Sequence, residues 1–161
     1  MIQRIQTVYL ALAILTAVCA LLFYSVSYWV EGTLVASIGS IRYWTDNQVL
    51  SDNLSSTWPL SIPLVLVILL NVMAIFLFRK RMRQLRIALF STILLVGYVL
   101  ALAFCTWFCK EQIAMLLDTT DLSMTFGISA FLPLVGIILN CMAIRGIRKD
   151  EALVRSLDRL R

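Results

Sequence analysis

The chain has no histidine and few charged residues, and its charges avoid four long apolar stretches. Its 161 residues are 61% hydrophobic and 14% charged, whereas an ordinary soluble domain is about one quarter charged. The lack of histidine removes the commonest general base and metal ligand. The sequence also has no glycine-rich phosphate-binding motif and no serine-nucleophile elbow. We therefore predict a non-enzymatic protein without a metal or cofactor.

The four apolar runs cover residues 5–30, 59–78, 87–108 and 127–144, and none of them contains a charged residue. About 20 apolar residues in a helix cross a bilayer core of about 30 Å. The first run is too long for the apolar core of a signal peptide, about 7–15 residues, so we expect an uncleaved helix. We predict an all-α integral membrane protein, a single domain over residues 1–161 in which four spans form an antiparallel bundle.

The basic residues predict the orientation of this bundle, because twelve of the 14 fall on one side. These twelve are Arg4, Arg79, Lys80, Arg81, Arg83, Arg86, Arg145, Arg148, Lys149, Arg155, Arg159 and Arg161. Positive residues in short loops stay in the cytoplasm, so both termini of this multi-pass protein are expected there. Anionic lipid headgroups are the expected partners of this basic inner face, and nucleic acid is not.

The loops on the other side are longer. Residues 33–44 read TLVASIGSIRYW, which fits either two short strands joined at Gly39-Ser40 or an irregular loop. In the second outer loop, Ile113, Leu116 and Leu117 repeat at helical spacing, which predicts a short helix at the membrane interface.

The tail, residues 149–161, predicts a basic amphipathic helix. Asp150 is its expected N-cap, and Leu153, Leu157 and Leu160 form one apolar stripe. Such a helix either lies on the inner leaflet or docks to a cytoplasmic protein partner.

An internal repeat links the second and fourth runs. ILLNVMAIFLFRK (Ile68–Lys80) aligns without gaps on IILNCMAIRGIRK (Ile137–Lys149). Either a helical hairpin has been duplicated in tandem or short apolar segments have converged. The alignment superposes Asn71 on Asn140. Two roles are open for these amides: hydrogen bonds between helices, or polar contacts in a lipid or quinone pocket.

Four cysteines occur, and only Cys105 and Cys109 lie close in sequence. Their i,i+4 spacing differs from the CxxC pair of a thiol oxidase, so we interpret them as small packing residues. A thiol redox protein and a transporter are the weaker functional hypotheses, the latter because no charge lies within a span.

The two ends of the chain, MIQRIQTVYLALA and IRKDEALVRSLDRLR, resemble those of the domain of unknown function 4293 family, four-span proteins of Bacteroidota. The resemblance extends over the full length. It implies a location in the bacterial inner (cytoplasmic) membrane and brings no established activity, and it directs attention to residues 3–6 and 148–161. We expect a small scaffold or accessory protein that presents its basic cytoplasmic face to a partner. The alternative is a lipid- or quinone-binding protein with a site near Asn71 and Asn140.

Overall fold

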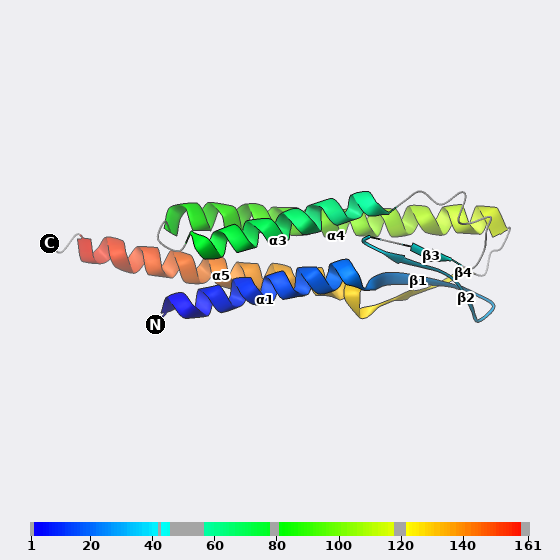
Figure 1. Cartoon of the computed structure of the whole chain (residues 1–161), viewed down its shortest axis with the longest axis horizontal. Coiled ribbons are helices and arrows are strands. Elements are labelled where there is room, and N and C mark those ends of the chain that lie inside the picture. The colour runs from blue at the N-terminus through cyan, green and yellow to red at the C-terminus, as the bar shows by residue number, and fades with distance from the viewer. Residues whose placement is uncertain (1, 42, 46–56, 78–80, 118–121, 159–161) are drawn as a thin grey trace.

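Four long helices run side by side, and a small antiparallel sheet lies at one end of them (Figure 1). The computed structural model describes residues 2–41, 43–45, 57–77, 81–117 and 122–158, and of residues 2–4, 81 and 153–158 only the backbone. The helices are α1 (Ile2–Leu22), α3 (Ser61–Phe76), α4 (Arg81–Leu117) and α5 (Ile128–Asp158), and the 3-10 turn η1 (Trp58–Leu60) precedes α3. The strands are β1 (Tyr24–Val30), β2 (Thr33–Gly39), β3 (Tyr43–Thr45) and β4 (Leu122–Phe126).

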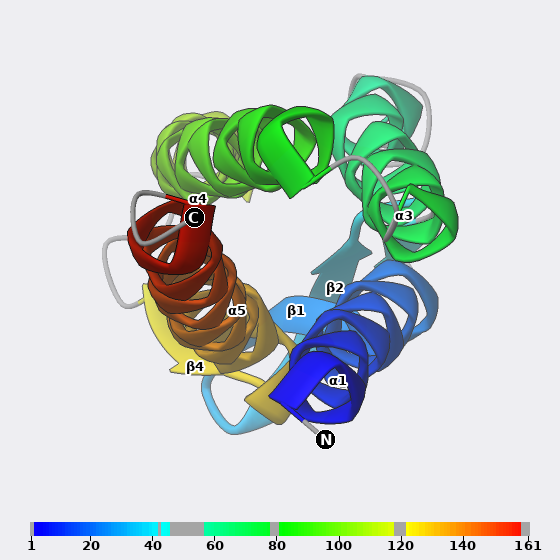
Figure 2. The same ribbon diagram turned by 90° about the vertical axis from the view of Figure 1, so that its left-hand side faces the viewer.

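Each of the four helices is long and apolar enough to cross a membrane. They form a ring in which α1 and α4 both pack against α3 and α5 (Figure 2). A hairpin duplicated about an axis along the bundle would produce this order, with α3 opposite α5; the duplication itself stays a prediction. We call the end with the start of α1 and the C-terminal part of α5 the basic end, and the opposite end the sheet end.

The prediction of an all-α fold is wrong, because the first apolar run does not form one helix. Helix α1 ends at Leu22, and the residues from Tyr24 to Val30 form β1. This segment, YSVSYWV, alternates small polar residues with aromatic and β-branched ones, a pattern typical of a strand. A helix over residues 5–30 would also be about 39 Å long, well beyond the bilayer core.

The four strands form one sheet in the order β3-β2-β1-β4, and every pairing is antiparallel. The two-residue turn Glu31-Gly32 joins β1 to β2, with φ of 49° and 79°. Positive φ at both positions is the requirement of a type I′ hairpin turn. Strand β2 ends at Gly39 and β3 follows Gly39-Ser40, where the sequence favours a turn. The sheet is larger than these two strands, because β1 and β4 also belong to it, and β4 comes from the second outer loop.

Helix α4 supplies the surface on which this sheet packs. Its 37 residues extend about 55 Å, and its last part passes beyond the end of α1. Cys109 and Ile113 of α4 are buried in one cluster with Tyr28, Ile38 and other side chains of the sheet. The sequence prediction of a separate interfacial helix around Ile113 is therefore wrong, because this segment continues α4.

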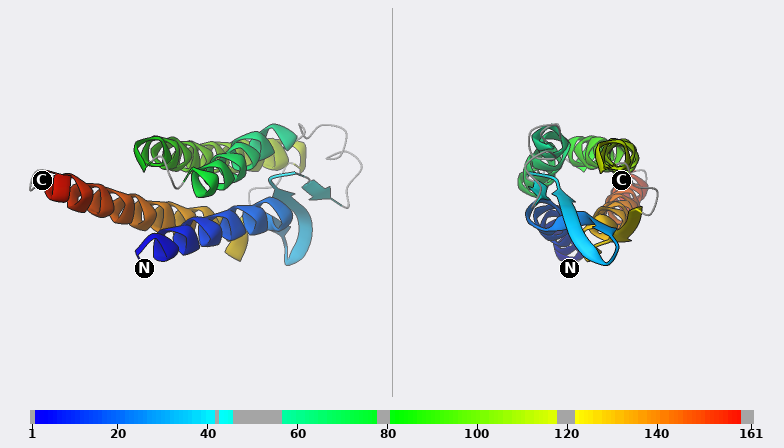
Figure 3. Two further views of the ribbon diagram at one scale, coloured as in Figure 1. Left: turned by 60° about the vertical axis from the view of Figure 1, so that its left-hand side comes forward. Right: turned by 90° about the vertical axis from the view of Figure 1, so that its right-hand side faces the viewer.

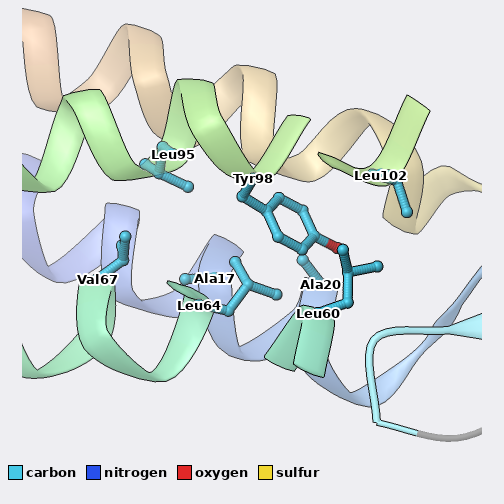
Figure 4. Close-up of a cluster of buried hydrophobic side chains, with 8 residues drawn as sticks. All are labelled: Ala17, Ala20, Leu60, Leu64, Val67, Leu95, Tyr98 and Leu102. Carbon is cyan, nitrogen blue, oxygen red and sulfur yellow. The ribbon is translucent and has the colours of Figure 1, made fainter. Parts of the chain in front are cut away.

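The sheet end of the bundle has a well-packed apolar core (Figure 4). Its buried members are Ala17, Ala20, Leu60, Leu64, Val67, Leu95, Tyr98 and Leu102. The Tyr98 hydroxyl lies 2.8 Å from Ser40 Oγ, and Ser40 Oγ also donates to the Ala20 carbonyl over 3.1 Å. The turn after β2 is thus tied to both α1 and α4.

The expectation of a separate tail helix is wrong, because the tail continues α5. It runs without interruption from Ile128 to Asp158, so Asp150 lies inside the helix and is not an N-cap. Its C-terminal part projects past the other helices at the basic end (Figures 1 and 3).

Candidate functional site: the polar interior and the basic end

Three polar side chains from three helices are buried in the interior of the bundle. Asn71 of α3, Ser91 of α4 and Asn140 of α5 each have 0% of their surface exposed. Asn140 Nδ2 donates a 3.2 Å hydrogen bond to Ser91 Oγ. Ala74 and Ala143, each one turn further along α3 and α5, share a cluster with Leu10 of α1. Because residues three apart share a helix face, both asparagines point inward at similar depth.

The amide of Asn71 has no hydrogen-bond partner for its Nδ2 or its Oδ1 among the described residues, and Asn140 Oδ1 has none either. Each unsatisfied buried polar group costs about 1–3 kcal/mol. Because Asn71 is fully buried, the surrounding side chains leave no solvent-sized space beside it. These asparagine atoms could therefore form hydrogen bonds that the described side chains around them do not provide.

A second polar level lies closer to the basic end. Gln6 of α1 donates from Nε2 to Asp150 Oδ2 of α5 over 2.6 Å, and the two side chains are 5% and 7% exposed. Gln84 of α4 is buried at the same end. A Cβ on Gly146 would lie 3.0 Å from Gln6 Cγ, so glycine allows α1 and α5 to approach closely beside this hydrogen bond.

The predicted basic face is described only in part. The side chains of Arg83, Arg86, Arg145, Arg148 and Lys149 are exposed. Arg79, Lys80, Arg159 and Leu160 lie outside the described residues, and of Arg81, Leu153, Arg155 and Leu157 only the backbone is described. Of the predicted leucine stripe, the backbone of Leu153 and Leu157 thus lies in the C-terminal part of α5.

Of the two cysteines near the sheet end, Cys109 lies in the packing between α4 and the sheet, and Cys105 packs against the core of the bundle. Cys109 is buried, Cys105 is partly buried, and both are free thiols. The neighbouring Tyr28 of β1 is held by a 2.8 Å hydrogen bond from its hydroxyl to the Thr106 carbonyl, and burial raises its pKa. A thiol buried in apolar surroundings is a poor nucleophile.

Sequence reasoning selected Asn71 and Asn140 but missed Ser91 and Gln84, and it drew attention to Gln6 only through the family resemblance of residues 3–6. Ser91 is followed by the polar Thr92 in an apolar run, and Gln84 lies among arginines ahead of that run. The sequence does not say which way either side chain faces. Across the described parts of the chain, no three histidine, cysteine, aspartate or glutamate side chains gather as a metal ion requires.

The family of the chain follows from a comparison with family models. Residues 2–160 match the family described as "Domain of unknown function (DUF4293)". The chain belongs to this family. The two terminal segments that carry the resemblance are joined in the fold by the hydrogen bond between Gln6 and Asp150. No curated protein matches the sequence.

Proposed function

We propose that the protein is a non-catalytic scaffold of the bacterial inner membrane, and that the projecting end of α5 holds a cytoplasmic protein partner. The supporting observation is the continuity of α5 from its apolar part through to Asp158. The residues after Ile144 extend the helix by about 21 Å. The last part of this extension stands past the ends of the other helices (Figure 3).

The direction of α5 favours a protein partner over the inner leaflet. A helix that continues along the bundle axis leads away from the membrane, and it would have to break in order to lie flat on lipid. The hydrogen bond from Gln6 to Asp150 holds α5 to α1 at the start of the projection. The exposed Arg145, Arg148 and Lys149 support the cytoplasmic placement of this end, since basic residues are retained on that side.

A second candidate function is the binding of a lipid or quinone near Asn71 and Asn140. The unpartnered amide atoms favour it, because a ligand carbonyl or hydroxyl would satisfy them. The complete burial of both residues opposes it, since the helices would have to separate before a ligand could enter. For this reason the scaffold is the preferred function.

Site-specific photo-crosslinking in native membranes tests the scaffold. A photoreactive amino acid replaces Ala152, which is exposed on the projecting segment. The matched control places it at Met115, which is exposed at the opposite end of the molecule. We expect a discrete protein adduct from position 152 and not from position 115. Adducts with lipid alone at position 152 would contradict a protein-binding tail.

A further inference from the structure

The small sheet stands outside the apolar part of the bundle. Exposed aromatic side chains follow α1, precede α3 and α5, and end the apolar run of α4: these are Phe23, Trp58, Phe126 and Trp107. Aromatic rings at such positions mark the boundary between lipid and water. Strand β4 runs toward this boundary, because it ends at Phe126 and α5 follows at once. Its start at Leu122 is about 13 Å further out, so the strand lies in water.

Strand β4 forms one edge of the sheet and presents backbone groups on its open side. The sheet order places β1 on one side of β4, and no described strand lies on the other (Figure 1). Gly127 donates its backbone N–H to the Ser25 carbonyl over 2.9 Å, and this pair continues the register of β1 with β4. Hydrogen-bonded pairs alternate in an antiparallel ladder, so every second residue of β4 counted from Gly127 bonds β1. The residues between them direct their N–H and C=O groups outward, and these are Leu122, Met124 and Phe126.

Strand β4 lacks the features by which proteins usually protect a sheet edge. Its sequence, LSMTF, contains no charged residue and no proline, and its pairing with β1 has no register shift. The opposite edge differs, because β3 is only three residues long. Short, charged or bulged edges resist pairing with another chain, whereas a regular uncharged edge accepts a further strand. Of the two edges, that of β4 is therefore the one suited to an extended segment.

A second copy of the chain does not fit this edge. Every pairing in the sheet is antiparallel, so the next strand runs away from the membrane, opposite to β4. Copies in one bilayer point the same way, and β4 of a neighbouring copy therefore runs toward the membrane. The strand that continues this sheet must come from another protein.

The charges around the sheet favour a basic segment. The two stretches that form this end, residues 23–58 and 109–127, contain six acidic residues and two basic ones. Glu31 is exposed in the turn after Val30, and Val30 pairs with Leu122 at the outer end of β4. A strand antiparallel to β4 brings its C-terminal end to this acid. Opposite charges across an interface speed encounter and fix the direction of the segment.

We propose that the β4 edge binds an extended, basic peptide segment of a protein on the sheet side of the membrane. The segment adds a further strand through the outward backbone groups of β4, with its basic residues at the end near Glu31. Ser123 and Thr125 are exposed on one face of β4, and small polar side chains of the segment lie beside them. This site is at the opposite end of the molecule from the partner proposed for the end of α5 and does not depend on it.

Fluorescence anisotropy tests the site on the full chain in nanodiscs of phosphatidylcholine, a lipid without net charge. The probe is the labelled peptide TVTVTKK. Its two controls are the same peptide with an N-methylated backbone, which lacks the donors of a strand, and the acidic peptide TVTVTEE. We expect the probe to bind and both controls to bind at least about tenfold more weakly. Equal binding of the three peptides, or no binding of the probe, would overturn the proposal.

Variants of Met124, in the middle of β4, separate the backbone from the side chain. Met124→Pro removes an outward N–H and leaves the ladder to β1, as proline on an edge strand allows. The matched control Met124→Val also loses the methionine side chain but keeps the N–H. We expect Met124→Pro to weaken binding of the probe by about tenfold, and Met124→Val to stay within about twofold of the natural chain. Equal affinities in the two variants would contradict pairing through this edge.

Hydrogen exchange of the natural chain gives a readout that requires no variant. The probe peptide should slow exchange of the outward amides of Leu122, Met124 and Phe126. Exchange at β3, the opposite edge, serves as the internal reference and should keep its rate. Slowing at β3 alone would place the peptide elsewhere. Slowing at β4 without peptide, as the protein concentration rises, would assign the edge to a second copy and overturn the proposal.

Discussion

Gln6 and Asp150 are 144 positions apart in the chain and share a buried 2.6 Å hydrogen bond. They come from the two terminal segments by which the sequence resembles its family. The bond joins the first turns of α1 to α5 at the point where α5 leaves the bundle. It therefore links the start of the chain to the position of the projecting helix.

This link predicts energetic coupling between the two residues. Gln6→Leu should destabilise the protein by about 1.5–3 kcal/mol, because it removes a buried hydrogen bond to a carboxylate. Asp150→Leu should cost a similar amount, and the double variant should cost clearly less than the sum. Thermal unfolding in detergent measures the cycle. Additive losses would mean that the pair does not act as a unit.

The two buried asparagines should respond differently to leucine. Asn140→Leu breaks the bond to Ser91 and should lower stability by about 0.6–1.7 kcal/mol. Asn71→Leu removes an amide that has no partner among the described residues, so stability should hold or rise. The measurement is again thermal unfolding in detergent. A large loss in Asn71→Leu would reveal a partner such as a bound ligand and would favour the lipid- or quinone-binding function.

Two helical glycines, Gly97 and Gly146, should respond in opposite directions to a larger side chain. Gly97 has open space where a Cβ would go, and Gly97→Ala should stabilise the protein by about 0.5–1 kcal/mol through helix propensity. Gly146→Leu would push a side chain into Gln6, only 3.0 Å from the Cβ position, and should lower the melting temperature by several degrees. The reverse order of melting temperatures would contradict the close approach of α1 and α5.

The sequence predicted the four apolar helices, because a long uncharged apolar run rarely forms a structure other than a long helix. The predicted ends of these helices were less accurate. The run 5–30 is apolar throughout, and hydropathy does not register the change at Tyr24 from a helical to an alternating pattern. The polar pair Lys110-Glu111 suggested the end of a span, whereas Ile113 continues α4 into a core that only the sheet completes.

The sequence likewise predicted some of the candidate site residues correctly and misplaced others. Asn71 and Asn140 stood out as amides inside apolar runs, and the structure places both in the interior. Asp150 was misinterpreted because a polar residue ahead of an amphipathic stretch is typical of an N-cap. Its true environment depends on Gln6, and a contact across 144 positions leaves no local signal.

Affinity purification from native membranes tests the central claim, that the end of α5 holds a protein partner. The natural chain is compared with Arg155→Gln/Arg159→Gln, near the C-terminus of the sequence, and with Arg83→Gln/Arg86→Gln, two exposed arginines of α4. The account predicts that the protein crosslinked from position 152 is lost with the first variant and retained with the second. Retention of that protein by both variants, or its loss from both alike, would contradict the claim.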